Sequence, residues 1–136
     1  MTTALFPGRF NPPHIGHILT LMRIYGDYDE IIVTVSNDTY NGAKTQVLTQ
    51  LQIIGVLRRV FRHLPKIRFI MIEPPLIRRK RYDVCKFDVV VTGNPKMIDH
   101  AALLGYPVRF VERSVVAGVE LSATMLRELY EKWRLS

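Results

Sequence analysis

The chain has a single cysteine, Cys85, among its 136 residues, and this scarcity excludes several classes of protein. One cysteine cannot form an internal disulfide, so a disulfide-stabilised secreted scaffold is excluded and a cytoplasmic location is expected. No apolar run approaches the roughly 18 residues of a membrane span, and the start of the chain lacks the basic-then-apolar pattern of a signal peptide. Cys85 is interpreted as a small packing residue.

Acidic residues are also in the minority: 12 Asp and Glu stand against 19 Lys and Arg, for a net charge of +7. This excess indicates an anionic partner without naming it. One basic group, within residues 58–68, lies along and just after a predicted helix and is interpreted as a solvated face. The run Arg78-Arg79-Lys80-Arg81 has only Tyr82 beside it, whereas single-stranded nucleic acids are bound by several interleaved aromatic side chains. We therefore do not expect nucleic acid as a partner.

Short apolar runs alternate with helical patterns along the sequence. The runs are Thr3–Phe6, Ile31–Val35, Arg68–Ile72, Val89–Thr92 and Val108–Val111. Continuous β-branched runs such as the second are typical of parallel strands covered on both faces. The helical patterns are His17–Tyr25, Gln46–His63, Lys96–Leu104 and Ser122–Trp133.

This alternation predicts an α/β fold with a doubly wound, five-stranded parallel sheet of Rossmann-like type, in the strand order 3-2-1-4-5. Residues 1–136 are expected to form a single domain. In this order the direction of winding switches between the first and fourth strands, and ligands bind at their carboxyl ends.

The segment from Gly8 to His17, Gly8-Arg9-Phe10-Asn11-Pro12-Pro13-His14-Ile15-Gly16-His17, joins the first strand to the first helix. Free backbone N–H groups and the positive end of a helix dipole at such a junction suit a phosphate. A lone histidine near a helix start is often a cap or a surface residue. Here two histidines and Arg9 converge on one turn, which favours a phosphate site.

A second candidate segment, residues 121–127, opens the last predicted helix. Ser122 is a natural N-cap, Thr124 lies in the first turn, and the long side chain of Arg127 can reach back toward the helix start. By itself this is a capped amphipathic helix with a solvated arginine. Paired with the histidine turn, it predicts hydroxyl and guanidinium ligands for the same polyphosphate.

These motifs carry a family resemblance. His14-Ile15-Gly16-His17 and Leu121-Ser122-Ala123-Thr124-Met125-Leu126-Arg127 resemble the (H/T)xGH and ISxTxxR motifs of a nucleotidyltransferase superfamily. Within it, Gly8-Arg9-Phe10-Asn11-Pro12 and Thr92-Gly93-Asn94-Pro95 are similar to the GRFQP and SGNP of archaeal-type nicotinamide-nucleotide (NMN) adenylyltransferases. The resemblance spans nearly the whole chain. It implies an adenylyltransferase that moves AMP from ATP to a mononucleotide phosphate, with NMN giving NAD and pyrophosphate.

The resemblance also implies roles for individual residues. The catalytic set is His14, His17 and Arg127; the ATP-binding set is Arg9, Phe10, His14, His17, Lys44, Ser122, Thr124 and Arg127; the acceptor-binding set is Asn94 and Tyr82. Mg²⁺ is expected to enter with ATP, held by phosphate oxygens and water, because no dedicated carboxylate cage is evident and no protein residue is assigned to it. A homo-oligomer is implied as well.

Departures from the family pattern leave the acceptor open. The tryptophan that would stack on nicotinamide before the fourth strand is missing, and Tyr82 is the candidate substitute. Residues 48–53 lack the acid and base of the relatives' TAGER-like segment. Lys44 is either a phosphate ligand or a plain surface lysine, and Asn94 is either a ribose or acceptor ligand or a turn-former before Pro95.

Three other functions are kept as alternatives. The first is a related adenylyl- or cytidylyltransferase acting on phosphopantetheine, flavin mononucleotide or a polyol phosphate. The second is a fragment of a class I aminoacyl-tRNA synthetase, which the short length and the missing KMSKS-like loop disfavour. The third is a module that binds ATP without turnover. The presence of both histidines and Arg127 disfavours it, because binding alone does not need this full set.

Overall fold

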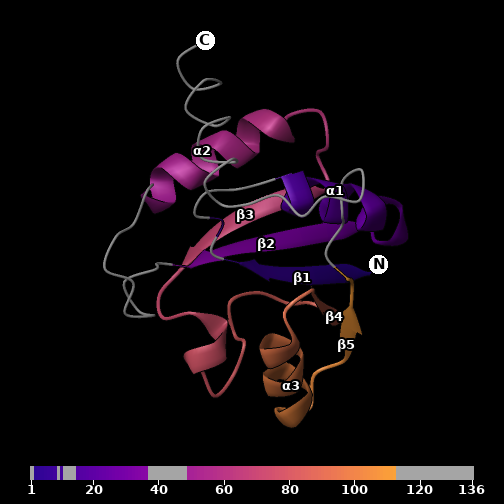
Figure 1. The fold of residues 1–136 in the computed structure, drawn as a ribbon, viewed down its shortest axis with the longest axis vertical. Helices are drawn as coiled ribbons and strands as arrows, with labels where there is room; N and C mark the ends of the chain where they lie inside the picture. Colours follow the sequence, from indigo (N-terminus) through magenta and orange to yellow (C-terminus); the bar gives the residue numbers. More distant parts are fainter. Residues whose placement is uncertain (1, 9, 11–14, 37–48, 113–136) are drawn as a thin grey trace.

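The computed structural model describes residues 2–8, 10, 15–36 and 49–112 of the chain. Its centre is a five-stranded parallel sheet in the order β3-β2-β1-β4-β5 (Figure 1). The strands are β1 (Thr3–Gly8), β2 (Glu30–Ser36), β3 (Ile67–Ile72), β4 (Val89–Thr92) and β5 (Val108–Phe110). The predicted fold class and strand order are therefore confirmed.

Helices cover both faces of this sheet (Figure 1). They are α1 (Ile15–Ile24), which continues into the 3-10 turn η1 (Tyr25–Asp27), α2 (Gln50–Val60), the 3-10 turn η3 (Leu76–Arg78) and α3 (Pro95–Leu103). Helices α1 and α2 lie on one face and α3 on the other, as right-handed crossovers require. The predicted helix Ser122–Trp133 lies outside the described residues. In the part of the chain that the structure describes, no helix is long and apolar enough to cross a membrane.

The two faces of the sheet bury separate apolar clusters, because neighbouring strand residues point to opposite sides. Ile31, Val33 and Val35 of β2 pack in the cluster beneath α1 and α2, whereas Ile32 joins Leu5 in the cluster beneath α3. Strand β2 is buried from its second residue to its end. Its unbroken β-branched run is thus explained by cover on both faces.

Helix α2 begins later than the sequence pattern predicts. The expected start at Gln46 is wrong, because Thr49 has extended backbone angles and caps the helix that begins at Gln50. The Thr49 hydroxyl accepts a hydrogen bond from the Gln52 backbone N–H, and the Gln52 side chain accepts one from the Thr49 N–H. This capping box is readable in the sequence as Thr-x-x-Gln, and it satisfies two N–H groups that the helix leaves free.

Strand β1 runs two residues beyond its predicted end and passes through Pro7, which is unusual inside a sheet. Every second residue of a strand directs its backbone groups toward the same neighbouring strand. The Thr3 carbonyl faces β4, because it accepts a hydrogen bond at 2.8 Å from the N–H of Asp88, the residue before β4. By this alternation Leu5 and Pro7 also face β4. Pairing with β4 ends at Leu5, whereas pairing with β2 continues to Gly8. Pro7 has no N–H to donate toward β4, which is consistent with the end of pairing between β1 and β4 at Leu5.

Candidate active site

The carboxyl ends of β1 and β4 lie at the same edge of the sheet, next to Gly8 and Asn94. Strand β1 leads through Gly8 toward α1, and β4 leads through Gly93 and Asn94 into α3. Parallel α/β proteins bind ligands at this position, outside the carboxyl ends of the strands that flank the switch in winding. The carboxyl ends of the first and fourth strands therefore lie side by side, as the predicted strand order requires.

Phe10 was predicted to take part in ATP binding, and its side chain is buried in the structure. Its side chain is 1% exposed and belongs to the core cluster beneath α1 and α2. Its backbone has a φ of 54°, a left-handed conformation that is uncommon for residues other than glycine. This turn of the backbone sends the ring inward, so the side chain of Phe10 is a packing residue rather than a surface for the nucleotide.

Gly8 is required by that inward ring. A Cβ atom added to Gly8 would lie 2.6 and 2.7 Å from two carbon atoms of the Phe10 ring. Real Cβ atoms essentially never come so close to other heavy atoms, so any side chain at Gly8 would displace the ring. The glycine that opens the motif is thus explained by close packing inside the turn.

His17 lies in the first turn of α1 and is partly buried. Its imidazole meets the Phe10 ring nearly edge to face, with ring centroids 4.5 Å apart and an interplanar angle of 63°. The predicted ligands Arg9, His14, Lys44, Ser122, Thr124 and Arg127 lie outside the described residues, and their roles stay predictions.

Asn94 sits at the carboxyl end of β4 as the N-cap of α3. Its side-chain oxygen accepts from the Lys96 backbone N–H at 3.0 Å, and its own N–H donates to the Thr92 hydroxyl at 3.1 Å. Pro95 occupies the first turn, where its missing N–H costs nothing. The turn-forming role of Asn94 is confirmed. Its exposed side chain lies beside the parting of β1 and β4.

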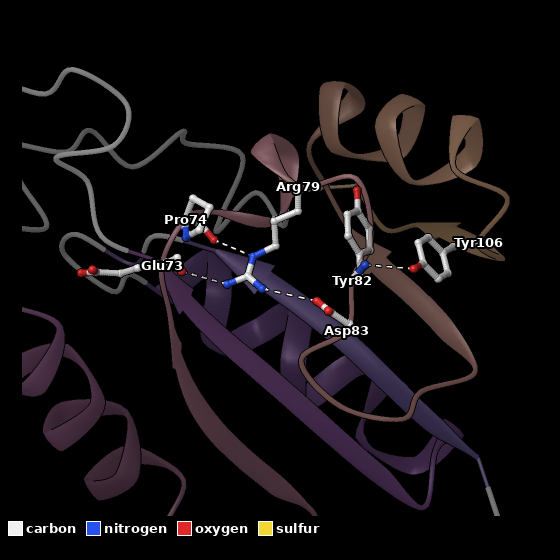
Figure 2. A network of polar contacts seen from close by, with 6 residues as sticks. All are labelled: Glu73, Pro74, Arg79, Tyr82, Asp83 and Tyr106. Carbon is white, nitrogen blue, oxygen red and sulfur yellow. Dashed lines mark hydrogen bonds and ion pairs between the residues drawn. The ribbon is translucent and has the colours of Figure 1, made fainter.

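Tyr82 does not offer the free ring that acceptor stacking needs. The residue is 1% exposed, its ring stacks on Tyr106 with centroids 4.8 Å apart, and its hydroxyl shares a hydrogen bond with His100 Nδ1. Its backbone N–H donates to the Tyr106 hydroxyl at 2.9 Å (Figure 2). Burial raises the pKa of Tyr82 to about 12. In this structure Tyr82 ties the segment between β3 and β4 to α3.

Arg79 stabilises the segment between β3 and β4 by contacts with other residues of that segment, a role that the sequence did not predict. Its Nε donates to the Pro74 carbonyl at 2.8 Å and one Nη to the Glu73 carbonyl at 3.1 Å, and its other Nη lies 3.6 Å from Asp83 Oδ1 (Figure 2). The side chain is only 19% exposed. Of the basic run over residues 78–81, this member is therefore structural. The Arg-x-x-x-Asp spacing was the available sign of it.

We expect Arg79→Met to lower the free energy of unfolding by about 1–3 kcal/mol, because two carbonyl groups lose a charged donor while the apolar stem is kept. Urea denaturation measures the loss. Arg78→Met is the matched control, since Arg78 is exposed, and it should change the free energy by no more than about 0.5 kcal/mol. Equal effects of the two substitutions would show that the Arg79 contacts do not stabilise the fold.

Gln50 fixes the neighbouring edge of the site. Its side-chain amide donates to the carbonyls of Val35 at 3.0 Å and Ile72 at 3.2 Å, which lie at or next to the last residues of β2 and β3. Helix α2 thus begins with a residue that joins the carboxyl ends of two strands. No pattern in the sequence distinguishes this glutamine from a solvent-exposed one.

The described residues contain no group of three or more His, Cys, Asp or Glu side chains placed to hold a metal ion. Among them, Thr92 and Asn94 at the end of β4 and His17 in the first turn of α1 carry hydroxyl, amide and imidazole groups. Such groups suit a phosphate that brings its own counterion better than they suit a bare divalent cation, for which carboxylate oxygens are preferred.

Comparison with known proteins agrees with this fold. A family model described as cytidylyltransferase-like matches residues 5–129. The fold and the match define a nucleotidyltransferase-type α/β protein, and the chain belongs to the cytidylyltransferase-like family. Its sequence is 33% identical over 141 residues to the nicotinamide-nucleotide adenylyltransferase of Pyrobaculum aerophilum, covering 97% of this chain and 78% of the relative. It is also 32% identical over 138 residues to the nicotinamide-nucleotide adenylyltransferase of Pyrococcus abyssi, covering 93% of this chain and 72% of that relative.

Solved structures share the fold at lower sequence identity. A bifunctional NMN adenylyltransferase/ADP ribose pyrophosphatase from Francisella tularensis has a TM-score of 0.69 and 12% identity, covering 97% of this chain and 42% of that one. A lipopolysaccharide core biosynthesis protein from Thermoplasma volcanium has a TM-score of 0.62 and 22% identity, covering 85% and 98%. At these identities the likeness concerns the fold alone.

Proposed function

We propose that this protein is an adenylyltransferase that transfers AMP from ATP to NMN, giving NAD and pyrophosphate. The observation that carries the proposal is the turn from β1 to α1, whose glycine and histidine lie at the switch point of a sheet of this family. Support for NMN as acceptor comes from relatives of that activity, which are aligned over 97% of this chain in one case.

The reaction is a direct displacement at phosphorus. An oxygen of the NMN phosphate forms a bond to the α-phosphorus of ATP while the bond from that phosphorus to the oxygen bridging to the β-phosphate breaks. The electron pair leaves with pyrophosphate. A phosphate monoester is a sufficient nucleophile, so no covalent enzyme intermediate is needed, and catalysis depends on positioning and on stabilising charge.

The residues of the two motifs divide this work. His17, in the first turn of α1, contacts the α-phosphate, where the positive end of the helix dipole also favours negative charge. His14 contacts the β and γ phosphates. The remaining triphosphate ligands are Arg9, Lys44, Ser122, Thr124 and Arg127. Mg²⁺ enters as part of the MgATP substrate, bound to phosphate oxygens and water.

Asn94 is the described residue that we propose to contact the acceptor. Its oxygen is used by the helix cap, which leaves the amide NH₂ as a donor at the carboxyl end of β4. Tyr82 contributes by holding the segment between β3 and β4, since its ring is covered by Tyr106. A cytoplasmic location and a homo-oligomeric state also belong to the proposal, from the single cysteine and the family resemblance.

A panel of acceptors tests the proposal. The purified protein is supplied with ATP or CTP and with NMN, phosphopantetheine, flavin mononucleotide or glycerol 3-phosphate, and pyrophosphate release and product mass are measured. We expect kcat/KM to be highest for ATP with NMN, by about tenfold or more, because discrimination is expressed in this ratio. A faster reaction with another acceptor would assign the alternative function. Binding of ATP without pyrophosphate release would identify a sensing module.

A further inference from the structure

The ring of Phe10 lies between Gly8 and His17, which are two residues of the same motif. On one side its ring packs so closely on Gly8 that a Cβ there would be 2.6 Å away. On the other side it meets the His17 imidazole at 4.5 Å. The ring is thereby wedged between the end of β1 and the start of α1.

The backbone at Phe10 is in a conformation that needs a reason. A non-glycine residue with φ of 54° is uncommon, and such strain is concentrated at sites where the surrounding structure enforces it. With this left-handed backbone conformation, the Phe10 ring points inward and packs against His17. Its centroid lies 6.1 Å from the centroid of the Phe6 ring. An extended residue there would leave the imidazole without this partner.

We propose that Phe10 is a positioning residue that fixes the orientation of the His17 imidazole. The positively polarised edge of one aromatic ring packs favourably on the face of another, and an edge-to-face pair has a defined geometry that an aliphatic side chain of similar volume does not impose. An imidazole that contacts the α-phosphate must be held within a narrow range of position and angle. Phe10 supplies that constraint without touching the nucleotide. This inference rests on the proposed role of His17.

The fold offers a matched control. Phe6 is an aromatic residue of the same core cluster and is 5% exposed; its one described aromatic contact is with Phe10. Phe6→Leu and Phe10→Leu therefore remove the same atoms from the same cluster, but only Phe10→Leu removes the partner of His17. Gly8→Ala is a third variant, which keeps Phe10 and displaces its ring.

The first measurement is a comparison of steady-state kinetics at a temperature where circular dichroism shows each variant to be folded. For Phe10→Leu we expect kcat to fall by about tenfold while KM for ATP and for NMN changes by less than about twofold, because an interaction of the transition state is lost. Gly8→Ala should act in the same direction, and it carries the test if Phe10→Leu does not fold. Phe6→Leu should keep kcat within about twofold of the wild type. Equal kcat values for Phe10→Leu and Phe6→Leu would overturn the inference.

A second measurement does not depend on activity. The His17 ring protons, assigned by comparison with His17→Gln in NMR spectra, should be shifted by the ring current of Phe10. They should move toward the values of an unstructured histidine in Phe10→Leu and Gly8→Ala but not in Phe6→Leu. Unchanged His17 shifts in Phe10→Leu would overturn the inference. If the shifts behave as expected while the wild type has no transferase activity, the geometry holds and the proposed function fails.

Discussion

Replacing His17 with alanine is expected to lower turnover by about 100-fold or more, a loss of about 3 kcal/mol of transition-state stabilisation. The expectation follows from the position of His17 in the first turn of α1, at the carboxyl end of β1. Negative charge grows on the oxygens around the α-phosphorus during transfer, and a fixed imidazole N–H at that place stabilises it. Pyrophosphate release at saturating ATP and NMN measures the effect.

His63→Ala is the control for this experiment. His63 is exposed after the end of α2, where its ring accepts a hydrogen bond from Arg62. Its removal should leave turnover within about twofold of the wild type, because groups far from the reacting atoms do not contribute to the transition state. Near-normal activity of a folded His17→Ala variant would refute the role assigned to His17.

The largest expected loss of stability comes from Tyr82→Ala, at about 3–5 kcal/mol. Tyr82 is the largest side chain that the fold buries fully among the described residues, and its removal empties the stack between Tyr106 and His100. Because small domains are stable by only about 5–15 kcal/mol, this change should bring the protein close to unfolding. Urea denaturation measures it.

Phe110→Ala is the matched control, since Phe110 is an aromatic residue of β5 that is 53% exposed. It should change the free energy of unfolding by about 0.5 kcal/mol or less. A loss for Tyr82→Ala that is no larger would mean that Tyr82 is not a packing residue. Its ring would then be open to stack on an acceptor, as the sequence alone suggested.

The pH dependence of stability gives an independent check on Tyr82. In the folded protein burial raises its pKa from 10.0 to about 12, so the unfolded chain loses this proton first as the pH rises. Ionisation then favours the unfolded state, and the free energy of unfolding should fall between about pH 10 and 12. In Tyr82→Phe this decline should be smaller, because the ionisable hydroxyl is gone.

The fold was predictable from the sequence because its main determinants are local and periodic. Uninterrupted β-branched runs identify strands covered on both faces, and their alternation with helical patterns leaves few topologies. The boundaries were less accurate where a side chain overrode the pattern. Thr49 delays the start of α2 with a capping box. The first strand was predicted to end at Phe6, but β1 continues through Pro7, which pairs with β2 and lies beyond the last pair with β4.

The site was predictable as a set of motifs but not as a set of contacts. The sequence brought Phe10 and His17 to one turn, yet nothing in it distinguishes a ring that faces the nucleotide from a ring that turns into the core. That choice depends on a left-handed backbone at Phe10 and on packing against Gly8. In the same way, the sequence shows Arg79 only as a member of a basic run and Tyr82 only as a candidate for stacking on the acceptor. Only their contacts in the fold, Arg79 with the Pro74 carbonyl and Tyr82 with the Tyr106 ring, show that both stabilise the segment between β3 and β4.

Pro7 has a consequence for how substrates reach the protein. Pro7 has no N–H, so the hydrogen bond that residue 7 would donate toward β4 is missing whether or not a ligand is bound. The end of pairing between β1 and β4 is therefore favoured by the sequence itself and does not depend on a bound nucleotide. We therefore expect the carboxyl ends of β1 and β4 to rearrange little when a nucleotide binds, so that little binding free energy is lost to reorganisation.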